Sequence, residues 1–226
     1  MPGRKFPLVT NQIYHVFNRG VAHQPTFLDK RDYIRAVDSM VYYQNAKPLL
    51  KYAKFLKLST QDREKSWEQF RNSENKLTEI ICYCFMPNHF HFLVKQLTDG
   101  GISKFLSNFT NSYTRYFNTK SKREGPLFTG KFKSVRIETD EQLLHTSRYI
   151  HLNPYTSYVV KRVEDLETYP YSSFPEYLEE NSLTGLCSKD AVVSNFSKRN
   201  TYKDFVFDSS DYQRRLDEIK HLIWNK

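Results

Sequence analysis

Two histidines separated by one residue are the feature of this sequence best suited to chemistry. His89 and His91 stand in the run HFHFLV, whose apolar, β-prone residues are typical of a strand. Because successive side chains of a strand point to opposite faces, both imidazoles lie on one face and Phe90 lies on the other. Imidazole is the commonest metal ligand, so the pair is a candidate half-site for a divalent cation. The alternative is a pair of surface histidines on the solvent face of a hairpin.

A second candidate lies on a predicted helix further along the chain. His145, Tyr149 and Asn153 follow one another at intervals of four residues, so they lie along one stripe of that helix. A tyrosine and an amide one turn apart could deliver a nucleophile and a metal-ligand oxygen to the same place. The alternative is structural: Asn153 ends the helix, and Tyr149 packs at the edge of the apolar face.

The elements that must position these residues follow one order along the chain. The patterns predict strands over 12–18, 77–85, 89–97 and 127–137, and helices over 29–45, 102–118 and 140–152. We expect Asp29 to cap the first helix, Thr139 or Asp140 to cap the last, and Asn153–Pro154 to stop it. The order β-α-β-β-α-β, followed by α, predicts an α+β, ferredoxin-like split βαβ fold, an antiparallel sheet with helices on one face.

Two segments fall outside this core order. Residues 46–76 are polar and charged, which indicates an insertion with one short helix over about 64–70. Residues 179–226 are predicted to form a C-terminal helical extension, with its last helix over about 210–224. We therefore expect one catalytic domain over 1–178 and an extension over 179–226.

The charge of the chain is concentrated in one segment. The 226 residues hold 34 Lys and Arg against 25 Asp and Glu, a net charge of +9. Residues 101–136 hold eight of those basic residues and a single acidic one, and so seven of the nine net charges. Aromatic residues interleave with the bases there, a mixture that suits single-stranded nucleic acid. An acidic partner is expected, although a solvated basic face would carry the same charge.

The cysteines and the hydropathy of the sequence indicate the cellular compartment in which the protein is expected. Cys82, Cys84 and Cys187 are odd in number and lack zinc-site spacing, so we expect reduced thiols in the core. No apolar run approaches the roughly 20 residues of a membrane span, and the first residues lack the apolar region of a signal peptide. The sequence therefore predicts a cytoplasmic, nucleoid-associated protein.

Three strings carry a family resemblance: MPNHFHFLV (86–94), GPLFTGKFKSVRI (125–137) and SRYIHLNPY (147–155). In this order and at these separations they resemble the single-tyrosine HUH transposases, most closely the REP-associated tyrosine transposases. The resemblance covers roughly residues 7–178. It implies a ferredoxin-like HUH nuclease domain that cleaves and rejoins single-stranded DNA beside hairpins, at palindromic repeats.

The resemblance also assigns roles to individual residues. His89 and His91 match the histidine pair that binds Mg²⁺ or Mn²⁺, and Tyr149 matches the nucleophile that forms a 5′-phosphotyrosine. Asn153 falls where relatives have a polar residue, often glutamine, that helps to hold the metal. His145 is a candidate to assist deprotonation of the tyrosine.

Basic residues near these motifs are candidates to bind the DNA backbone. The candidates are Lys120, Lys122, Arg123, Lys131, Lys133, Arg136 and Arg148, with Arg4 and Lys5 of the N-terminal tail. Transposases of this class commonly act as dimers whereas REP-associated relatives can be monomeric, so a homodimer remains open.

Two other functions fit the same residues. One is a domesticated protein that binds nucleic-acid hairpins on this fold without mobilising DNA. The other is a metal-dependent phosphodiesterase that acts through a bound water, in which Tyr149 is structural. A pure binder would have no need of His89, His91 and Tyr149 together, which favours the transposase-like enzyme.

Overall fold

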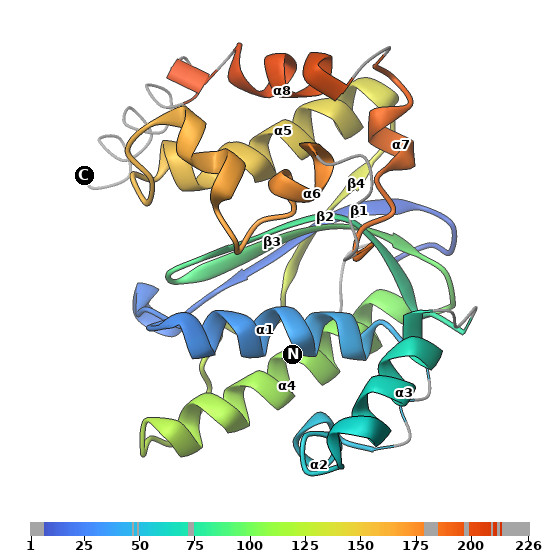
Figure 1. The fold of residues 1–226 in the computed structure, drawn as a ribbon, viewed down its shortest axis with the longest axis vertical. Coiled ribbons are helices and arrows are strands. Elements are labelled where there is room, and N and C mark those ends of the chain that lie inside the picture. Colours follow the sequence, from blue (N-terminus) through green and yellow to red (C-terminus); the bar gives the residue numbers. More distant parts are fainter. Residues whose placement is uncertain are drawn as a thin grey trace. The chain divides into compact units, whose positions relative to one another are not determined.

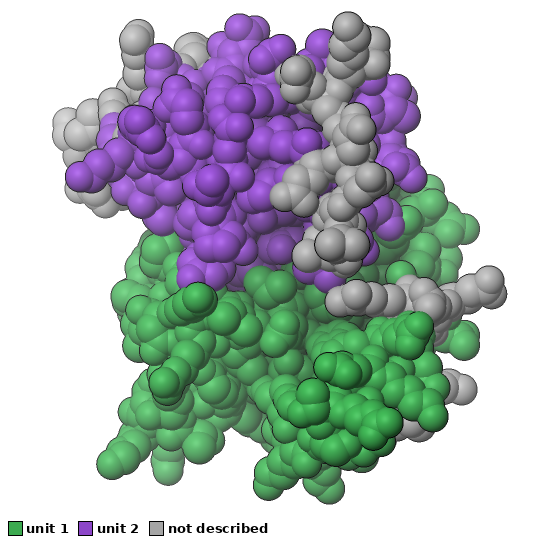
Figure 2. Space-filling model, in the orientation of Figure 1, with its two compact units in different colours: residues 1–79, 87–89, 94–136 green, residues 80–86, 90–93, 137–226 purple. Residues whose placement is uncertain are grey.

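The computed structural model describes residues 7–46, 48, 50–71, 75–178, 185–196, 199–208, 210, 211 and 213. The chain forms two compact units, and each is assembled from several segments (Figure 2). Unit 1 comprises residues 1–79, 87–89 and 94–136, and unit 2 comprises 80–86, 90–93 and 137–226. This division does not fall at residue 178, and the predicted domain boundary there stays a prediction.

Four strands form one sheet. They are β1 (Ile13–Arg19), β2 (Thr78–Met86), β3 (His89–Gln96) and β4 (Lys133–Ile137), in the order β2-β3-β1-β4. Only Pro87 and Asn88 separate β2 from β3, so these two strands form a tight hairpin. The α+β class and the ferredoxin-like strand order are confirmed.

The last strand is shorter than the predicted 127–137. Leu127 O accepts a hydrogen bond from Val21 N at 3.0 Å, and Thr129 N donates to Arg19 O at 2.8 Å. Pairing with the end of β1 therefore begins near residue 127, and Phe128 forms an isolated bridge. Gly130 then adopts a φ of +35°, which a strand cannot accommodate. The chain resumes as β4 only at Lys133.

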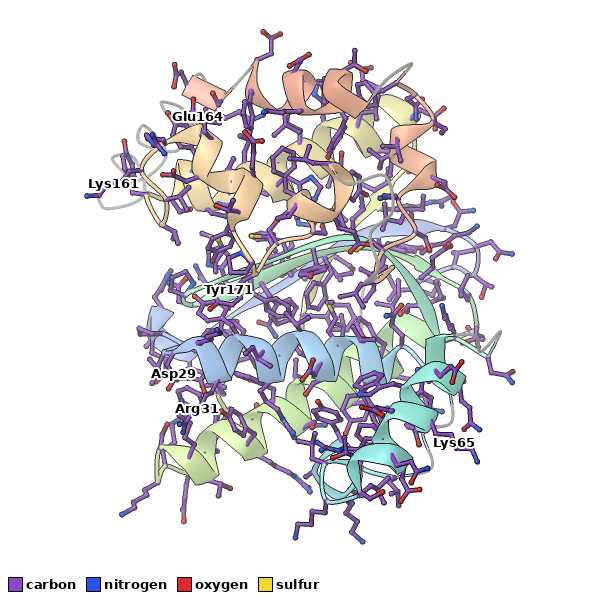
Figure 3. All side chains as sticks on the ribbon, in the orientation of Figure 1. Asp29, Arg31, Lys65, Lys161, Glu164 and Tyr171 are labelled. Atoms are coloured by element: carbon purple, nitrogen blue, oxygen red, sulfur yellow. The ribbon has the colours of Figure 1, made fainter. Side chains whose placement is uncertain are left out.

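Unit 1 contains the longest helix. Its helices are α1 (Lys30–Tyr43), α2 (Tyr52–Phe55), α3 (Thr60–Arg71) and α4 (Gly101–Lys120), after a 3-10 turn at Val21–His23. Helices α1 and α4 pack against each other (Figure 1). Asp29 caps α1 as predicted, because its Oδ1 accepts hydrogen bonds from Arg31 N at 2.9 Å and Asp32 N at 3.1 Å. Figure 3 labels Asp29 at this end of the helix.

The predicted insertion holds two helices, α2 and α3, rather than one. Their aromatic side chains gather around Tyr42 of α1. The ring of Tyr42 lies 5.0 Å from that of Phe55, and Trp67 lies 5.4 Å from Phe55. Trp67 and Phe70 come from α3, so both helices contribute to this cluster. The segment therefore forms a small aromatic core, although most of its residues are polar.

Unit 2 contains the remaining helices. They are α5 (Asp140–Thr156), a 3-10 helix at Val163–Thr168, α6 (Phe174–Leu178), α7 (Asp190–Val193) and α8 (Arg199–Phe207). The loop before α6 pairs with β2, since Phe85 N donates to the carbonyl of Tyr171 at 2.8 Å. Figure 3 labels Tyr171 on that loop. Helices α7 and α8 belong to the predicted extension, whereas most of the predicted helix over 210–224 lies outside the described residues.

Helix α5 does not stop before Pro154, and the prediction that it ends there is wrong. The helix continues to Thr156 with the proline inside its last turn. Proline removes one N–H from the backbone ladder, but near a C-terminus that loss concerns a single bond. Ser157 N closes the end by donating to Asn153 O at 3.0 Å. At the other end Thr139 caps the helix as predicted, because its Oγ1 accepts from Gln142 N at 3.1 Å.

The three cysteines are buried and free, which confirms the prediction of reduced core thiols. Burial raises the pKa of each thiol. Among the residues that the structure describes, no helix combines the length and the apolar content that crossing a bilayer requires.

Candidate functional site

The structure brings His91 and Tyr149 together within unit 2. Their rings meet edge to face, with centroids 5.5 Å apart and planes at 87°. His91 comes from β3 and is only 5% exposed, whereas Tyr149 comes from α5 and is partly exposed. Edge-to-face packing is a favourable aromatic geometry that fixes the tyrosine ring beside the histidine. Two residues that lie far apart in the sequence are therefore neighbours in the structure.

His89 stands at the start of β3, and its ring is oriented by its neighbour. Its Nδ1 lies 2.6 Å from Asn88 Oδ1. The amide of Asn88 donates through Nδ2 to His23 O at 3.3 Å, so its Oδ1 is the acceptor. His89 then carries its proton on Nδ1, and its Nε2 keeps the lone pair. A second partner that fixes the tautomer in this way is usual for histidines that bind metals.

Helix α5 is fixed by a buried imidazole two residues after the tyrosine. His151 is fully buried, and both ring nitrogens have partners. Its Nδ1 lies 2.7 Å from Tyr202 Oη on α8, and its Nε2 lies 2.8 Å from Ser173 Oγ. Ser173 also accepts a hydrogen bond from Tyr83 N of β2 at 2.8 Å. This His151 network ties α5 to α8 and, through Ser173, to β2.

The hydroxyl partners of His151 have further hydrogen bonds. Tyr202 Oη lies 3.1 Å from Ser147 Oγ, which donates to Leu144 O at 2.8 Å. Ser173 Oγ also lies 3.2 Å from the carbonyl oxygen of Tyr83. Burial lowers the pKa of His151 to about 3, so the imidazole stays neutral at physiological pH.

Asn153 lies one turn after the tyrosine, as its spacing requires. It is buried, and its Nδ2 donates to the carbonyl oxygen of Tyr149 at 3.1 Å. The amide group is thus held against its own helix, with its nitrogen committed to the backbone. Its Oδ1 is the atom that a cation would bind.

His145 contacts Arg148 on the same helix. Arg148 Nη2 donates to His145 Nδ1 at 2.7 Å, and His145 Nε2 lies 3.7 Å from Glu141 Oε1. The guanidinium of Arg148 also lies 4.4 Å from the centre of the Phe205 ring. Arg148 is therefore engaged with α8 as well as with His145, and both residues keep their assigned roles only as predictions.

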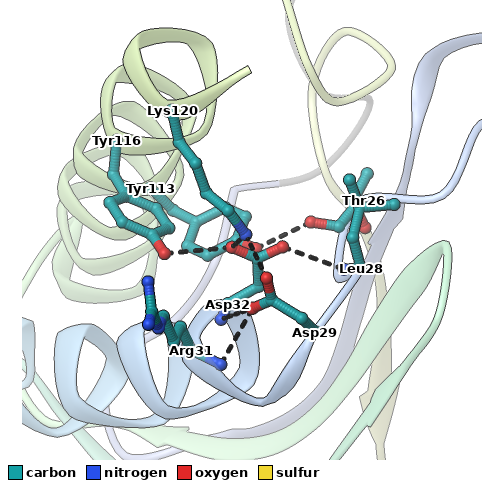
Figure 4. Close-up of polar contacts among 8 residues, drawn as sticks. All are labelled: Thr26, Leu28, Asp29, Arg31, Asp32, Tyr113, Tyr116 and Lys120. Atoms are coloured by element: carbon teal, nitrogen blue, oxygen red, sulfur yellow. Dashed lines mark hydrogen bonds and ion pairs between the residues drawn. The ribbon is translucent and has the colours of Figure 1, made fainter.

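Lys120 is held by two carboxylates. Its Nζ lies 2.7 Å from Asp29 Oδ2 and 2.6 Å from Asp32 Oδ1 (Figure 4). Asp32 is completely buried, and its carboxylate also accepts from Tyr116 Oη at 3.0 Å and from Leu28 N at 2.9 Å. The lysine therefore neutralises a buried acid between α1 and α4. This structural role accounts for its charge without DNA.

The other basic candidates differ in their exposure. Arg123 is partly buried and donates to Asn118 Oδ1 at 2.9 Å and to Pro126 O at 3.0 Å, which braces its loop. Arg136 is exposed and donates to Gln12 Oε1 at 2.8 Å. Lys122, Lys131 and Lys133 are exposed as well. Arg4 and Lys5 lie outside the described residues.

Two residues of this site were not identified from the sequence. Asn88 lies between two predicted strands, and its position next to His89 places an acceptor within reach of the ring. Ser147 and His151 are spaced i, i+4 among apolar residues, the pattern of a buried polar pair on one helix face. That spacing is the signal that could have identified it.

Comparisons with known proteins give one family match and one similar solved structure. Residues 50–153 match the family model described as "Transposase IS200 like". A solved REP-associated tyrosine transposase, bound to a REP hairpin, has a similar structure with a TM-score of 0.50 at 15% identity, over 78% of this chain and 84% of that chain. No curated protein sequence matches. Residues 50–153 are thus similar to the IS200-like transposases, and the chain shares the fold of a solved REP-associated tyrosine transposase.

Proposed function

We propose that this protein is a metal-dependent endonuclease and strand transferase for single-stranded DNA, with Tyr149 as its nucleophile. The observation that carries the proposal is the contact between the rings of His91 and Tyr149, at 5.5 Å. The ring that carries the proposed nucleophile lies beside an imidazole, a side chain of a metal-binding type. The match of residues 50–153 to the IS200-like transposases supports DNA as the substrate.

The candidate ligands are two imidazoles and one amide, so a divalent cation held by them would keep open coordination positions. His89 offers an Nε2 lone pair, since its Nδ1 is held by Asn88. Among the described residues, no group of three or more His, Cys, Asp or Glu is arranged to hold a metal. His89, His91 and the amide oxygen of Asn153 would hold it, and water and phosphate oxygens would complete the sphere. Mg²⁺ or Mn²⁺ would offset phosphate charge.

The proposed reaction makes and breaks one bond at phosphorus. Tyr149 Oη attacks the phosphorus atom, so a bond forms between the tyrosine oxygen and phosphorus while the bond to the 3′-oxygen breaks. The phenol proton leaves to a base, and the 3′-oxygen departs as a hydroxyl. Another 3′-hydroxyl can reverse the step and rejoin strands, because the phosphotyrosine keeps the phosphodiester energy.

Helix α5 must hold the tyrosine still during both steps. The His151 network supplies this, because it joins α5 to α8 and to β2 through hydrogen bonds of 2.7 and 2.8 Å. A nucleophile fixed in its attack position saves orientational entropy. The solved neighbour was bound to a REP hairpin, so DNA carrying a hairpin is the first substrate to test.

A covalent-adduct assay tests the proposal. The full chain is incubated with end-labelled, hairpin-bearing single-stranded DNA and Mn²⁺, and then separated under denaturing conditions. We expect a labelled protein–DNA adduct that disappears in Tyr149→Phe and persists in Tyr158→Phe, which changes an exposed tyrosine after the same helix. An adduct that survives Tyr149→Phe would move the nucleophile to another residue. Hairpin binding without any adduct would support the domesticated binding protein instead.

The metal is tested separately. Excess EDTA is expected to abolish the adduct, and Mn²⁺ or Mg²⁺ to restore it. His89→Ala and His91→Ala are each expected to raise the Mn²⁺ concentration needed for half-maximal adduct formation. An adduct that forms equally well with EDTA would refute metal dependence. Cleavage without an adduct would point to the phosphodiesterase that uses water.

A further inference from the structure

Arg35 of α1 is a buried cation with no carboxylate at ion-pair distance among the described residues of unit 1. The residue is 8% exposed, and its Nε is buried without a hydrogen-bond partner. Its guanidinium carbon lies 4.2 Å from the centre of the Tyr52 ring and 5.3 Å from that of Tyr116. These aromatic faces attract a cation but do not neutralise it. Among the described residues, no carboxylate lies within 4.0 Å of the guanidinium.

Asp38 interacts with Arg35 from beyond the distance of an ion pair. It lies almost one turn further along α1, and its Oδ2 accepts a hydrogen bond from Tyr52 Oη at 3.1 Å. The charge of Arg35 acts to lower the pKa of Asp38, but burial outweighs it and raises that pKa. A buried charge without a close partner is costly. An anion that reached Arg35 would remove that cost, so the residue is preorganised for anion binding.

Arg35 lines a groove of about 850 Å³ within unit 1. This volume lies in the range of small-molecule sites. One wall is a stripe of polar side chains on α4, at the spacing of one helix face: Asn108, Asn111, Ser112, Arg115 and Thr119. The opposite wall is apolar and comes from α2 and the residues around it: Pro48, Leu50, Ala53 and Leu56. Figure 1 shows α1, α2 and α4 in the same part of unit 1.

The charge of the groove has one sign. Its charged lining residues are Arg35, Lys51, Arg115 and Lys120, and none of the described lining residues is Asp or Glu. Lys120 is already paired with Asp29 and Asp32, whereas the other three have no carboxylate within 4.0 Å in the part of the chain that the structure describes. The groove therefore selects anions and disfavours polyamines or metal cations.

The polar and apolar residues that line the groove together indicate which class of anion it binds. The apolar wall, with partly exposed Leu50 and Leu56, offers a flat surface for a ring. The carboxamides of Asn108 and Asn111 each offer a donor and an acceptor, which suits the edge of a nucleobase. An arginine at the floor suits a phosphate. An inorganic anion would leave the apolar wall unused.

We propose that this groove binds a single nucleotide, with its phosphate at Arg35 and its base between the α4 stripe and the apolar wall. Two ligands carry this phosphate and base: a free mononucleotide, and an unpaired nucleotide within a DNA strand. None of the groove residues is His89, His91 or Tyr149, so the site is separate from the proposed strand-transfer chemistry and does not depend on it.

Calorimetric titration of the full chain tests the groove. The probes are the four deoxynucleoside 5′-monophosphates, inorganic phosphate, and a hairpin-free single-stranded octanucleotide. We expect at least one mononucleotide to bind at one site per chain, with inorganic phosphate at least ten-fold weaker. If only the octanucleotide binds, and the variants below weaken it, the proposal holds with the DNA strand as the source.

Variants place the binding in the groove. Arg35→Met is expected to weaken nucleotide binding at least ten-fold, and Asn111→Asp, an exposed change that adds a repelling charge, to do the same. Arg31→Met changes an exposed arginine of the same helix that does not line the groove, and it is expected to bind as wild type does. Tyr149→Phe is likewise expected to retain binding, so a failure of the proposed nuclease activity stays distinguishable.

Two results would overturn the proposal. One is nucleotide affinity that Arg35→Met and Asn111→Asp leave unchanged, because the ligand would then bind elsewhere. The other is inorganic phosphate that binds as tightly as every mononucleotide, because the walls would then contribute nothing. Should Arg35→Met fail to fold, Asn111→Asp decides the question alone.

Discussion

Acid is expected to destabilise this protein through the buried imidazole of His151. In the folded chain its pKa is about 3, whereas an exposed histidine in the unfolded chain has a pKa of about 6.5. Below pH 6.5 the unfolded state therefore binds a proton that the folded state does not. Stability is present in full above pH 6.5 and is lost as the pH falls toward 3. At pH 5, about 1.5 pH units below the unfolded value, the loss amounts to about 2 kcal/mol.

Urea unfolding of wild type and His151→Gln at pH 7.5 and pH 5 measures this contribution. Other groups also titrate, because burial lowers the pKa of His15 to about 4 and raises those of Asp38 and Glu176. These groups are common to both proteins and cancel in the difference. We expect the wild type to lose about 2 kcal/mol more than His151→Gln between the two pH values. His145→Gln, a half-exposed change on the same helix, is the control and is expected to follow the wild type.

Equal losses in wild type and His151→Gln would refute the reasoning, because a neutral, buried imidazole would then contribute nothing to the pH dependence. An imidazole of His151 that titrates near pH 6.5 in NMR spectra of the folded chain would refute it directly. The NMR measurement needs no variant, so it decides the question even if His151→Gln unfolds.

Three further predictions concern packing and charge. Asp32→Ala is expected to lower the free energy of unfolding by about 3 kcal/mol, because it removes the buried partner of an ion pair. Asp29→Ala removes a half-exposed helix cap and is expected to lower it by about 1 kcal/mol. Urea denaturation of both variants measures the difference. Gly101→Ala is expected to cost about 2 kcal/mol in the same assay, because its new Cβ would lie 2.3 Å from the backbone oxygen of Leu77. If Lys133 contacts a DNA phosphate, Lys133→Gln is expected to reduce the slope of log affinity against log salt by about one, measured by fluorescence anisotropy, and an unchanged slope would remove it from the DNA contacts.

Most of the fold was predictable because the deciding signals are local. Asp29 and Thr139 cap helices through their own side chains, and these caps follow from residue type and position. The exceptions arise where tertiary structure overrides a local rule. Pro154 fails to stop α5 because it falls in the last turn, which the sequence alone does not locate. The aromatic core formed by α2 and α3 was not predicted, because its central residue, Tyr42, lies on another helix.

The candidate site was predictable only in part for a similar reason. Strand alternation and helical spacing identified His89, His91 and Tyr149, since these rules act within one element. The partners that orient or fix them lie elsewhere in the chain or in a turn. Asn88 holds the ring of His89, and His151 reaches Tyr202 of α8. Periodicity within one element cannot show such contacts between elements.

The basic residues show most clearly how far the site can be predicted from the sequence alone. Counting along the sequence directs attention to residues 101–136, yet Lys120 and Arg123 of that segment have partners within the protein. Arg35 lies outside the segment and contributes nothing to its count, but it is the buried cation that lacks a close carboxylate. Because a phosphate gains most from a cation that is desolvated and uncompensated, the pairing of each charge matters more than its density along the chain. A search for anion sites in this protein therefore begins at Arg35 rather than at the most basic segment.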